Sequence, residues 1–293
     1  MTPIPVDPDR CAALAVLLRR CWEIREQYTG DDVGWSGDSG SPVESARIEF
    51  GLALPGGTRM VQSCFASAHS RLTVMTEHLS AMARLLDEEE LAKVGVRTLH
   101  VICRAALETG ARCSWMLDPD LSTECRVMRH LADQLHSAEH AEELLKQAKI
   151  SDPMGPTVER VREISEGLGP DFAVTRNGRH WQVGTEARPG DAAAVRELMR
   201  ETTYAVSVDM IYPLLCATTH GTAFTMLWGF RDAGVAFGDE SVLTKEPERE
   251  DVEHPIGMAL DAFTVAMSRA ARLLGRERTR IELFRGRVDA ALS

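Results

Sequence analysis

Three charged side chains follow one another at intervals of four residues within the segment 94–117, VGVRTLHVICRAALETGARCSWML. A helix places Arg104, Glu108 and Arg112 in a row on one side, where Glu108 can pair with either arginine. A buried carboxylate of this kind can perform general acid–base catalysis, and an arginine can bind a carboxylate of a ligand through two hydrogen bonds. We therefore take Glu108 as a candidate catalytic residue and Arg104 and Arg112 as candidate substrate-binding residues.

A second apolar segment, 203–230, TYAVSVDMIYPLLCATTHGTAFTMLWGF, carries the remaining helical candidates. Helical spacing places Tyr212, Cys216 and His220 on one face. Asp209 shares that face but lies eleven residues before His220, about 16 Å along a helix, so the two side chains cannot form a catalytic dyad. His220 is the second candidate catalytic residue, for proton transfer, and Tyr212 is a candidate substrate-binding residue.

These two segments also have a purely structural interpretation. Both are apolar nearly all round, so both are expected to be helices buried in a bundle. His220 could then donate a hydrogen bond to a backbone carbonyl, and the row 104–112 could be a buried ionic row that fixes helix packing. In the functional alternative, the polar row on the first helix, with Glu108, and the polar side chains of the second helix, with His220, lie around one cavity.

One pattern typical of a metal site is present: His136, Glu139 and His140 match the H-x-x-E-H motif of some zinc peptidases. On a helix whose apolar face is centred near Leu131 and Leu135, both histidines fall about 140–180° away, on the solvent side. The chain contains no glycine-rich phosphate loop, no Rossmann fingerprint and no G-x-S-x-G motif. We therefore expect no metal site and no cofactor.

The periodicity of apolar residues and the helix-capping residues predict an all-α protein, and the short links between long helices indicate an antiparallel helical bundle. One β-hairpin is expected near 172–183 because Asn177-Gly178 is a strong hairpin signal, and Trp181 on that hairpin is a further candidate substrate-binding residue, on a lid. Helices are expected from Pro8 to about Gly30 and at about 42–53, 58–86, 88–117, 120–149, 156–167, 189–200, 203–229 and 254–290. Residues 1–293 are interpreted as a single helical domain with a hairpin insertion at 170–186 and an acidic loop at 230–253.

Composition narrows the class of partner. The net charge of −11 disfavours nucleic acid and anionic membrane surfaces, both of which attract basic proteins. No uncharged apolar stretch is long enough to span a membrane, and the first residues, MTPIPVDPDR, lack the features of a signal peptide. The seven cysteines include no C-x-x-C pair and are expected to be free thiols in a reducing compartment, so we expect a cytoplasmic protein.

The segments 104–120 (RAALETGARCSWMLDPD), 129–143 (RHLADQLHSAEHAEE) and 212–222 (YPLLCATTHGT) resemble uncharacterised helical proteins of high-GC bacteria. The resemblance covers about residues 90–225 and implies a helical fold and a bacterial origin, but no particular activity. A more distant similarity to HEPN bundles rests on Arg71 and His78, whose spacing matches the Arg-x₄₋₆-His motif of HEPN ribonucleases. No such motif occurs at the segment around His220.

Two classes of function follow. The first is a protein that binds or transforms a small molecule in a polar site within a helical bundle, with acid–base chemistry in a biosynthetic pathway. The second is a helical homodimeric interaction module without catalysis, because a long helix at 254–290 that is rich in Arg and Glu suits contacts with a partner. An HEPN-like ribonuclease or toxin is a third alternative.

Overall fold

The computed structural model describes residues 7–30, 37–54, 56–87, 96–149, 157–178, 180–220 and 249–293. Within them the fold is all-α with one small antiparallel sheet of strand order β1-β2-β3, as the sequence predicts. The helices are α1 (Pro8–Thr29), α2 (Pro42–Ala53), α3 (Gly57–Asp87), α5 (Val96–Met116), α6 (Thr123–Gln147), α7 (Val158–Gly167), the short 3₁₀ helix η1 (Pro170–Phe172), α8 (Asp191–Met199), α9 (Val208–Thr219), α11 (Arg249–Leu274) and α12 (Thr279–Leu292). The strands are β1 (Val174–Asn177), β2 (His180–Val183) and β3 (Glu186–Ala187).

Capping residues explain where several helices begin. Asp7 accepts a hydrogen bond from the backbone N–H of Asp9 at 3.0 Å, Pro8 occupies the first turn of α1, and Gly30 ends that helix with a φ of +52°. The hydroxyl of Ser122 accepts from the backbone N–H of Cys125 at 3.2 Å and starts α6. The predicted starts of both helices are confirmed to within three residues.

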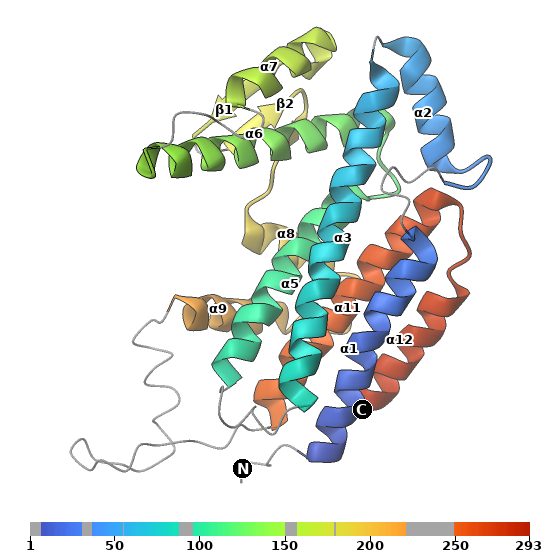
Figure 1. Ribbon diagram of the computed structural model, residues 1–293, viewed down its shortest axis with the longest axis vertical. Coiled ribbons are helices and arrows are strands. Elements are labelled where there is room, and N and C mark those ends of the chain that lie inside the picture. Colours follow the sequence, from blue (N-terminus) through green and yellow to red (C-terminus); the bar gives the residue numbers. More distant parts are fainter. Residues whose placement is uncertain are drawn as a thin grey trace.

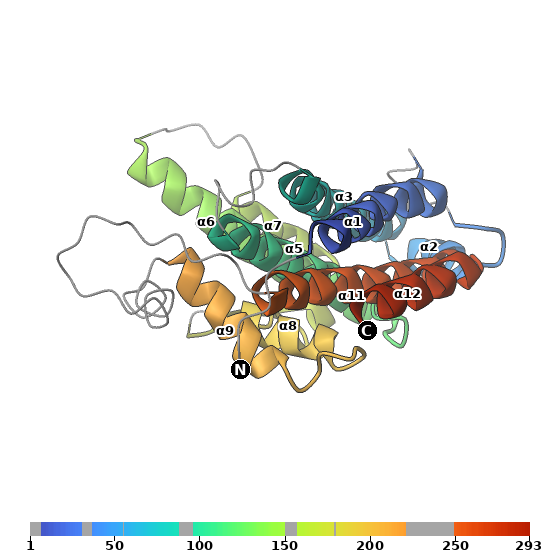
Figure 2. The ribbon, with the colours of Figure 1, turned by 90° about the horizontal axis from the view of Figure 1, so that it is seen from below.

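Five helices, α1, α3, α5, α11 and α12, run along the long axis of the molecule (Figure 1). The successive pairs α3 and α5, and α11 and α12, are antiparallel neighbours. Viewed from the end of the bundle, α11 lies in the middle, with α12 beside it and α1, α3 and α5 around it (Figure 2). One continuous core of buried side chains extends from α1 to α12 and includes β2.

The expectation of a single long helix at 254–290 is wrong, because this stretch forms two helices, α11 and α12. The chain leaves the helix at Gly275, whose φ of +74° suits a glycine, and α12 folds back beside α11. Every residue from Pro255 to Met267 is buried, because small and apolar residues occur on all sides of this part of α11. The helix therefore forms the centre of its own chain's core.

An arm composed of α6, α7 and the sheet projects from one end of the bundle (Figure 1). The predicted hairpin is confirmed: Asn177 pairs with His180, Val174 pairs with Val183, and Gly178 turns with a φ of +61°. The third strand, β3, pairs with β2 and was not expected. Its pairing positions the segment 188–191, which leads directly into α8.

Two expectations fall partly outside the described residues. Of the acidic loop expected at 230–253, residues 249–253 belong to α11, and the remainder lies outside the described part of the chain. The start of the predicted helix 88–117 lies outside it as well, since α5 is described from Val96. No helix in the described ranges combines the length and the apolar character that crossing a membrane requires.

Candidate functional site

Helix α9 is shorter and more peripheral than the sequence predicts. It spans Val208–Thr219, and the segment 221–248, which contains the end of the predicted helix, lies outside the described residues. Of its side chains, Val208, Tyr212 and Leu215 are buried; they form a stripe of helical spacing that faces the bundle. The expectation that this helix is buried all round is wrong, because the rest of its surface is exposed or half-buried.

Four predicted site residues meet where α9 packs on α5. Glu108 accepts two hydrogen bonds on the same oxygen, Oε1: one from the Tyr212 hydroxyl at 2.8 Å and one from Nε of Arg104 at 2.7 Å. Nη1 of Arg104 lies 3.3 Å from Nε2 of His220. We call Arg104, Glu108, Tyr212 and His220 the α5–α9 cluster. One arginine thus joins the two candidate catalytic residues, which come from helices more than a hundred positions apart in the chain.

Burial and the neighbouring carboxylate determine the protonation of the phenol. Burial, followed by the hydrogen bond to Glu108 and its negative charge, raises the pKa of Tyr212 well above its usual range, and Cys216 adds to the effect. The phenol therefore keeps its proton at neutral pH and acts as a donor. Burial alone would lower the pKa of Arg104, but the hydrogen bond and charge of Glu108 raise it above the ordinary value.

The contact between Arg104 and His220 selects a tautomer of the imidazole. A guanidinium can only donate hydrogen bonds, so Nε2 of His220 must be the acceptor and the proton must lie on Nδ1. His220 caps the C-terminal end of α9 and is exposed. Its imidazole is therefore accessible to water, which a histidine buried in a bundle would not be.

Arg112, the third member of the predicted row, pairs elsewhere. Its Nη2 donates to Oδ1 of Asp191 at 2.8 Å, at the start of α8. Of the two arginines with which Glu108 was expected to be able to pair, it therefore pairs with Arg104 and not with Arg112. The reason is that Asp191, which is distant in sequence, competes with Glu108 for Arg112. Helix spacing cannot indicate such a distant partner.

Asp191 belongs to a chain of ion pairs that the sequence did not predict. Nη2 of Arg188 contacts Oδ1 of Asp191 at 3.2 Å, and its Nε contacts Oδ1 of Asp133 at 3.3 Å. Asp133 also pairs with Arg71 of α3. We call Arg71, Asp133, Arg188, Asp191 and Arg112 the Arg–Asp network. Sequence spacing gave no signal for it, because Asp133 lies about 200° round the helix from Leu131, on the side assigned to solvent, although the structure buries it.

Trp181 is not part of the α5–α9 cluster. It lies on β2, is only 5% exposed, and its Nε1 donates to Oε2 of Glu139 on α6 at 2.9 Å. The guanidiniums of Arg162 and Arg176 lie 5.8 and 4.9 Å from the centre of its ring. Trp181 thus attaches the sheet to α6 within the arm, so the hairpin is packed in place by its own tryptophan.

The histidines of the H-x-x-E-H pattern differ from each other. His140 is exposed, as expected, whereas His136 is half-buried beside the Arg–Asp network. Burial, followed by the charge of Arg188, lowers the pKa of His136. Within the described part of the chain, no group of three or more His, Cys, Asp or Glu side chains is arranged to hold a metal ion.

A buried histidine on the other side of α6 was also missed. Nε2 of His130 lies 3.1 Å from the hydroxyl oxygen of Ser63 on α3. Burial lowers the pKa of His130 to about 4, so the imidazole is neutral at pH 7. Arg71, which suggested the HEPN pattern with His78, pairs instead with Asp133 near this histidine.

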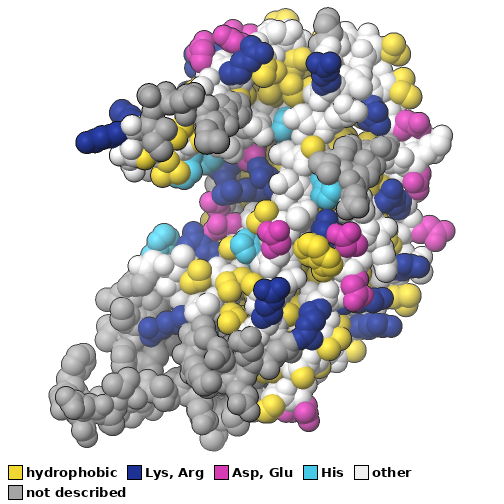
Figure 3. All heavy atoms as spheres, in the orientation of Figure 1, with side chains coloured by type: hydrophobic (Ala, Val, Ile, Leu, Met, Phe, Trp, Pro, Cys, Tyr) yellow, Lys and Arg dark blue, Asp and Glu magenta, His cyan; other side chains and the backbone are white. Residues whose placement is uncertain are grey.

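The α5–α9 cluster is open to the surface. Two cavities among the described residues lie elsewhere: one of about 450 Å³ is lined by Arg272, Arg276, Glu277 and Arg278, and another lies beside the sheet. Neither is lined by the α5–α9 cluster. Figure 3 shows a hollow in the molecular surface between the arm and α9, where basic, acidic and histidine side chains gather.

The site and the fold together define an all-α protein with a polar cluster at a helix–helix contact. Comparison of the chain with known protein families, curated proteins and solved structures found no match to any of them.

Proposed function

We propose that the α5–α9 cluster binds a small polar molecule and transfers a proton to or from it. The observation that supports this proposal is the double hydrogen bond at Glu108, whose Oε1 accepts from both Arg104 and Tyr212 while Arg104 also reaches His220. A protonated phenol, a carboxylate, a guanidinium and an imidazole thus follow one another in a chain of direct contacts, Tyr212–Glu108–Arg104–His220. Such a combination of an acid, a base and a charge-stabilising group is typical of general acid–base sites.

Each residue has a distinct role in this proposal. Glu108 fixes the positions of Arg104 and Tyr212 by accepting from both. His220 takes up the proton at Nε2: its imidazole is exposed, and the Nε2 lone pair, which accepts from Arg104 in the free protein, becomes available when that guanidinium turns to the bound molecule. Arg104 stabilises negative charge that develops on the bound molecule, as a guanidinium next to a reacting group does in many enzymes.

Affinity selection from a library of small carboxylic acids, phosphates and amides, read out by native mass spectrometry, tests the proposal. A compound that binds the site should be retained by the wild type and held about tenfold more weakly by Arg104→Gln, since a hydrogen bond to a charged group contributes about 1.5 kcal/mol or more. Conversion of that compound, followed by a change in its mass or by exchange of a proton for deuterium, should be lost in His220→Ala.

The matched control for the histidine variant is His140→Ala, which removes an exposed imidazole on α6. It should bind and convert the compound like the wild type. If no compound distinguishes the wild type from Arg104→Gln, the binding proposal is wrong, and if His220→Ala converts a bound compound at the wild-type rate, the proton-transfer role is wrong.

A further inference from the structure

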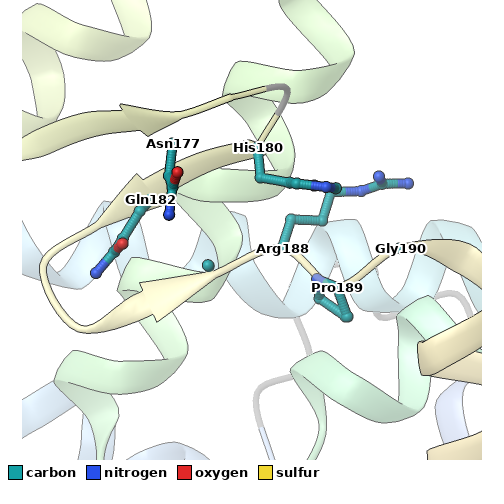
Figure 4. Close-up of a pocket in the computed structure, with 7 residues that line it drawn as sticks. Asn177, His180, Gln182, Arg188, Pro189 and Gly190 are labelled. Carbon is teal, nitrogen blue, oxygen red and sulfur yellow. The ribbon is translucent and has the colours of Figure 1, made fainter.

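A cavity of about 330 Å³ lies beside the small sheet, on the arm. Its volume falls within the range of small-molecule pockets. It is lined by the side chains of Asn177, His180 and Gln182 from the hairpin and by that of Arg188 (Figure 4). The remaining lining residues are Ala187, Pro189 and Gly190.

The lining is unusual for a chain with a net charge of −11, because none of the seven described residues that line this cavity is acidic. Asn177 and Gln182 offer amide groups, His180 offers an exposed imidazole, and Arg188 offers a guanidinium. Gly190 is the N-cap of α8 and makes no side-chain capping bond, so the first backbone N–H groups of that helix add partial positive charge at the same wall.

Arg188 is fixed in this wall by the Arg–Asp network. Its side chain is 7% exposed and is held by Asp133 on one side and Asp191 on the other. The same two carboxylates also serve Arg71 and Arg112. Three guanidiniums therefore share two carboxylates, and the network keeps one positive charge that its own members do not neutralise.

The positive charge of the network also shifts the pKa values of two half-buried groups beside it, His136 and Asp191. Burial, followed by the charge of Arg188, lowers the pKa of His136, so this imidazole does not add a second positive charge at neutral pH. Burial alone would raise the pKa of Asp191, but Arg112 and Arg188 lower it below the ordinary value, so that carboxylate stays ionised. The surplus charge of the network is thus one guanidinium, and Arg188 is the member that lines a cavity.

We propose that this cavity, which we call the sheet cavity, is a binding site for a small molecule carrying a phosphate or carboxylate group. The anionic group would lie against Arg188 and the N-terminus of α8, where its charge balances the surplus of the network. The amides of Asn177 and Gln182 and the imidazole of His180 would bind polar atoms of the same molecule. This site is separate from the α5–α9 cluster and does not depend on its proposed function.

Titration of inorganic phosphate into the full chain at constant ionic strength tests the proposal, with the imidazole resonances of His180 followed by NMR. Saturable shifts of His180 are expected, and a rise in unfolding temperature should accompany them because a ligand stabilises the state that it binds. Gln182→Leu and Arg188→Lys should each weaken phosphate binding about tenfold. The first variant removes an amide, and the second removes a guanidinium that can form two hydrogen bonds to one anion. Acetate, titrated in the same way, separates a phosphate site from a general anion site.

A control variant makes the result specific. His140→Ala lies outside the sheet cavity and should leave the phosphate titration unchanged. Gln182 is half-buried at the rim and takes no part in the ion pairs, so its variant remains informative if Arg188→Lys loses its fold. The absence of saturable shifts with both anions, or equal affinity in the wild type and Gln182→Leu, would overturn the proposal.

Discussion

The hydroxyl of Tyr212 donates to Oε1 of Glu108 across 2.8 Å and so joins α9 to α5. Because Tyr212 is the only buried polar side chain among the described residues of α9, this bond is the main polar attachment of that helix to the bundle. A small change at this position therefore tests both the packing of α9 and the integrity of the α5–α9 cluster.

Tyr212→Phe should destabilise the protein by about 1.5 kcal/mol, because it removes a hydrogen bond to a charged acceptor and keeps the ring. Tyr28→Phe is the matched control, since the Tyr28 hydroxyl donates at 2.6 Å to an uncharged acceptor, the backbone carbonyl of Glu277. Urea denaturation of both variants measures the difference. A larger loss of stability in Tyr28→Phe would contradict the expectation that the bond from Tyr212 to Glu108 is the stronger of the two.

Asp133→Ala should cost about 3–5 kcal/mol, because its side chain is 3% exposed and its removal leaves Arg71 and Arg188 without their shared carboxylate. Asp209→Ala is the control: Asp209 pairs with Arg196 at the surface and its side chain is 66% exposed, so its loss should cost less than about 1 kcal/mol. Thermal and chemical unfolding of the two variants should give clearly different losses. Similar values would show that the Arg–Asp network contributes no more than a surface ion pair.

His130 should make stability depend on pH in a defined window. Burial lowers the pKa of its folded-state imidazole from 6.5 to about 4, so below pH 6.5 the unfolded chain binds a proton that the folded chain does not. Stability should therefore fall between pH 6.5 and about 4, with a slope of up to about 1.4 kcal/mol per pH unit from this group. His130→Gln should flatten the curve over that window, and a curve parallel to that of the wild type would contradict the burial of a neutral imidazole.

Asp261 should make the stability of the protein depend on pH in the opposite direction, so that stability falls as the pH rises. It is 2% exposed in α11, and burial raises its pKa despite the charge of Arg285 and a hydrogen bond from Thr203. A raised folded-state pKa contributes stability that is complete at low pH and is lost as the pH rises through that pKa. The stability of Asp261→Asn relative to the wild type should accordingly increase from pH 4 to pH 7, as measured by urea denaturation at both values. A difference that does not change with pH would show that Asp261 ionises in the folded protein as easily as in the unfolded chain.

Local signals predicted most of the fold correctly. Asp7 and Ser122 marked helix starts because a side-chain oxygen near a free backbone N–H is a local interaction. Asn177-Gly178 marked a turn because such a turn needs a positive φ, which Gly178 adopts at +61°. The length of the last helix was wrong because one glycine, Gly275, within a run of charged residues ends it. The burial of α9 was overestimated because an apolar sequence does not show which of its sides the bundle covers.

The candidate site was predictable only where it depends on helix periodicity. The spacing of Arg104 and Glu108 fixed their contact, and the spacing of Tyr212 and His220 placed both on one side of α9. The partner of Arg112 could not be predicted, because Asp191 lies 79 residues later in the chain and reaches it through tertiary folding. The Arg–Asp network and the sheet cavity are missing from the sequence interpretation for the same reason.

The polar row on α5 has one further consequence. Arg104 and Arg112 stand eight residues apart on one rigid helix, about 12 Å along its axis, and Gly110 between them packs closely against Met75 of α3. An anion at Arg188 that competes with Asp191 for this guanidinium would change the pairing between Asp191 and Arg112, and with it the electrostatic field along the helix as far as Glu108. The two sites would then be thermodynamically linked, so that each ligand alters the affinity of the other by the same factor.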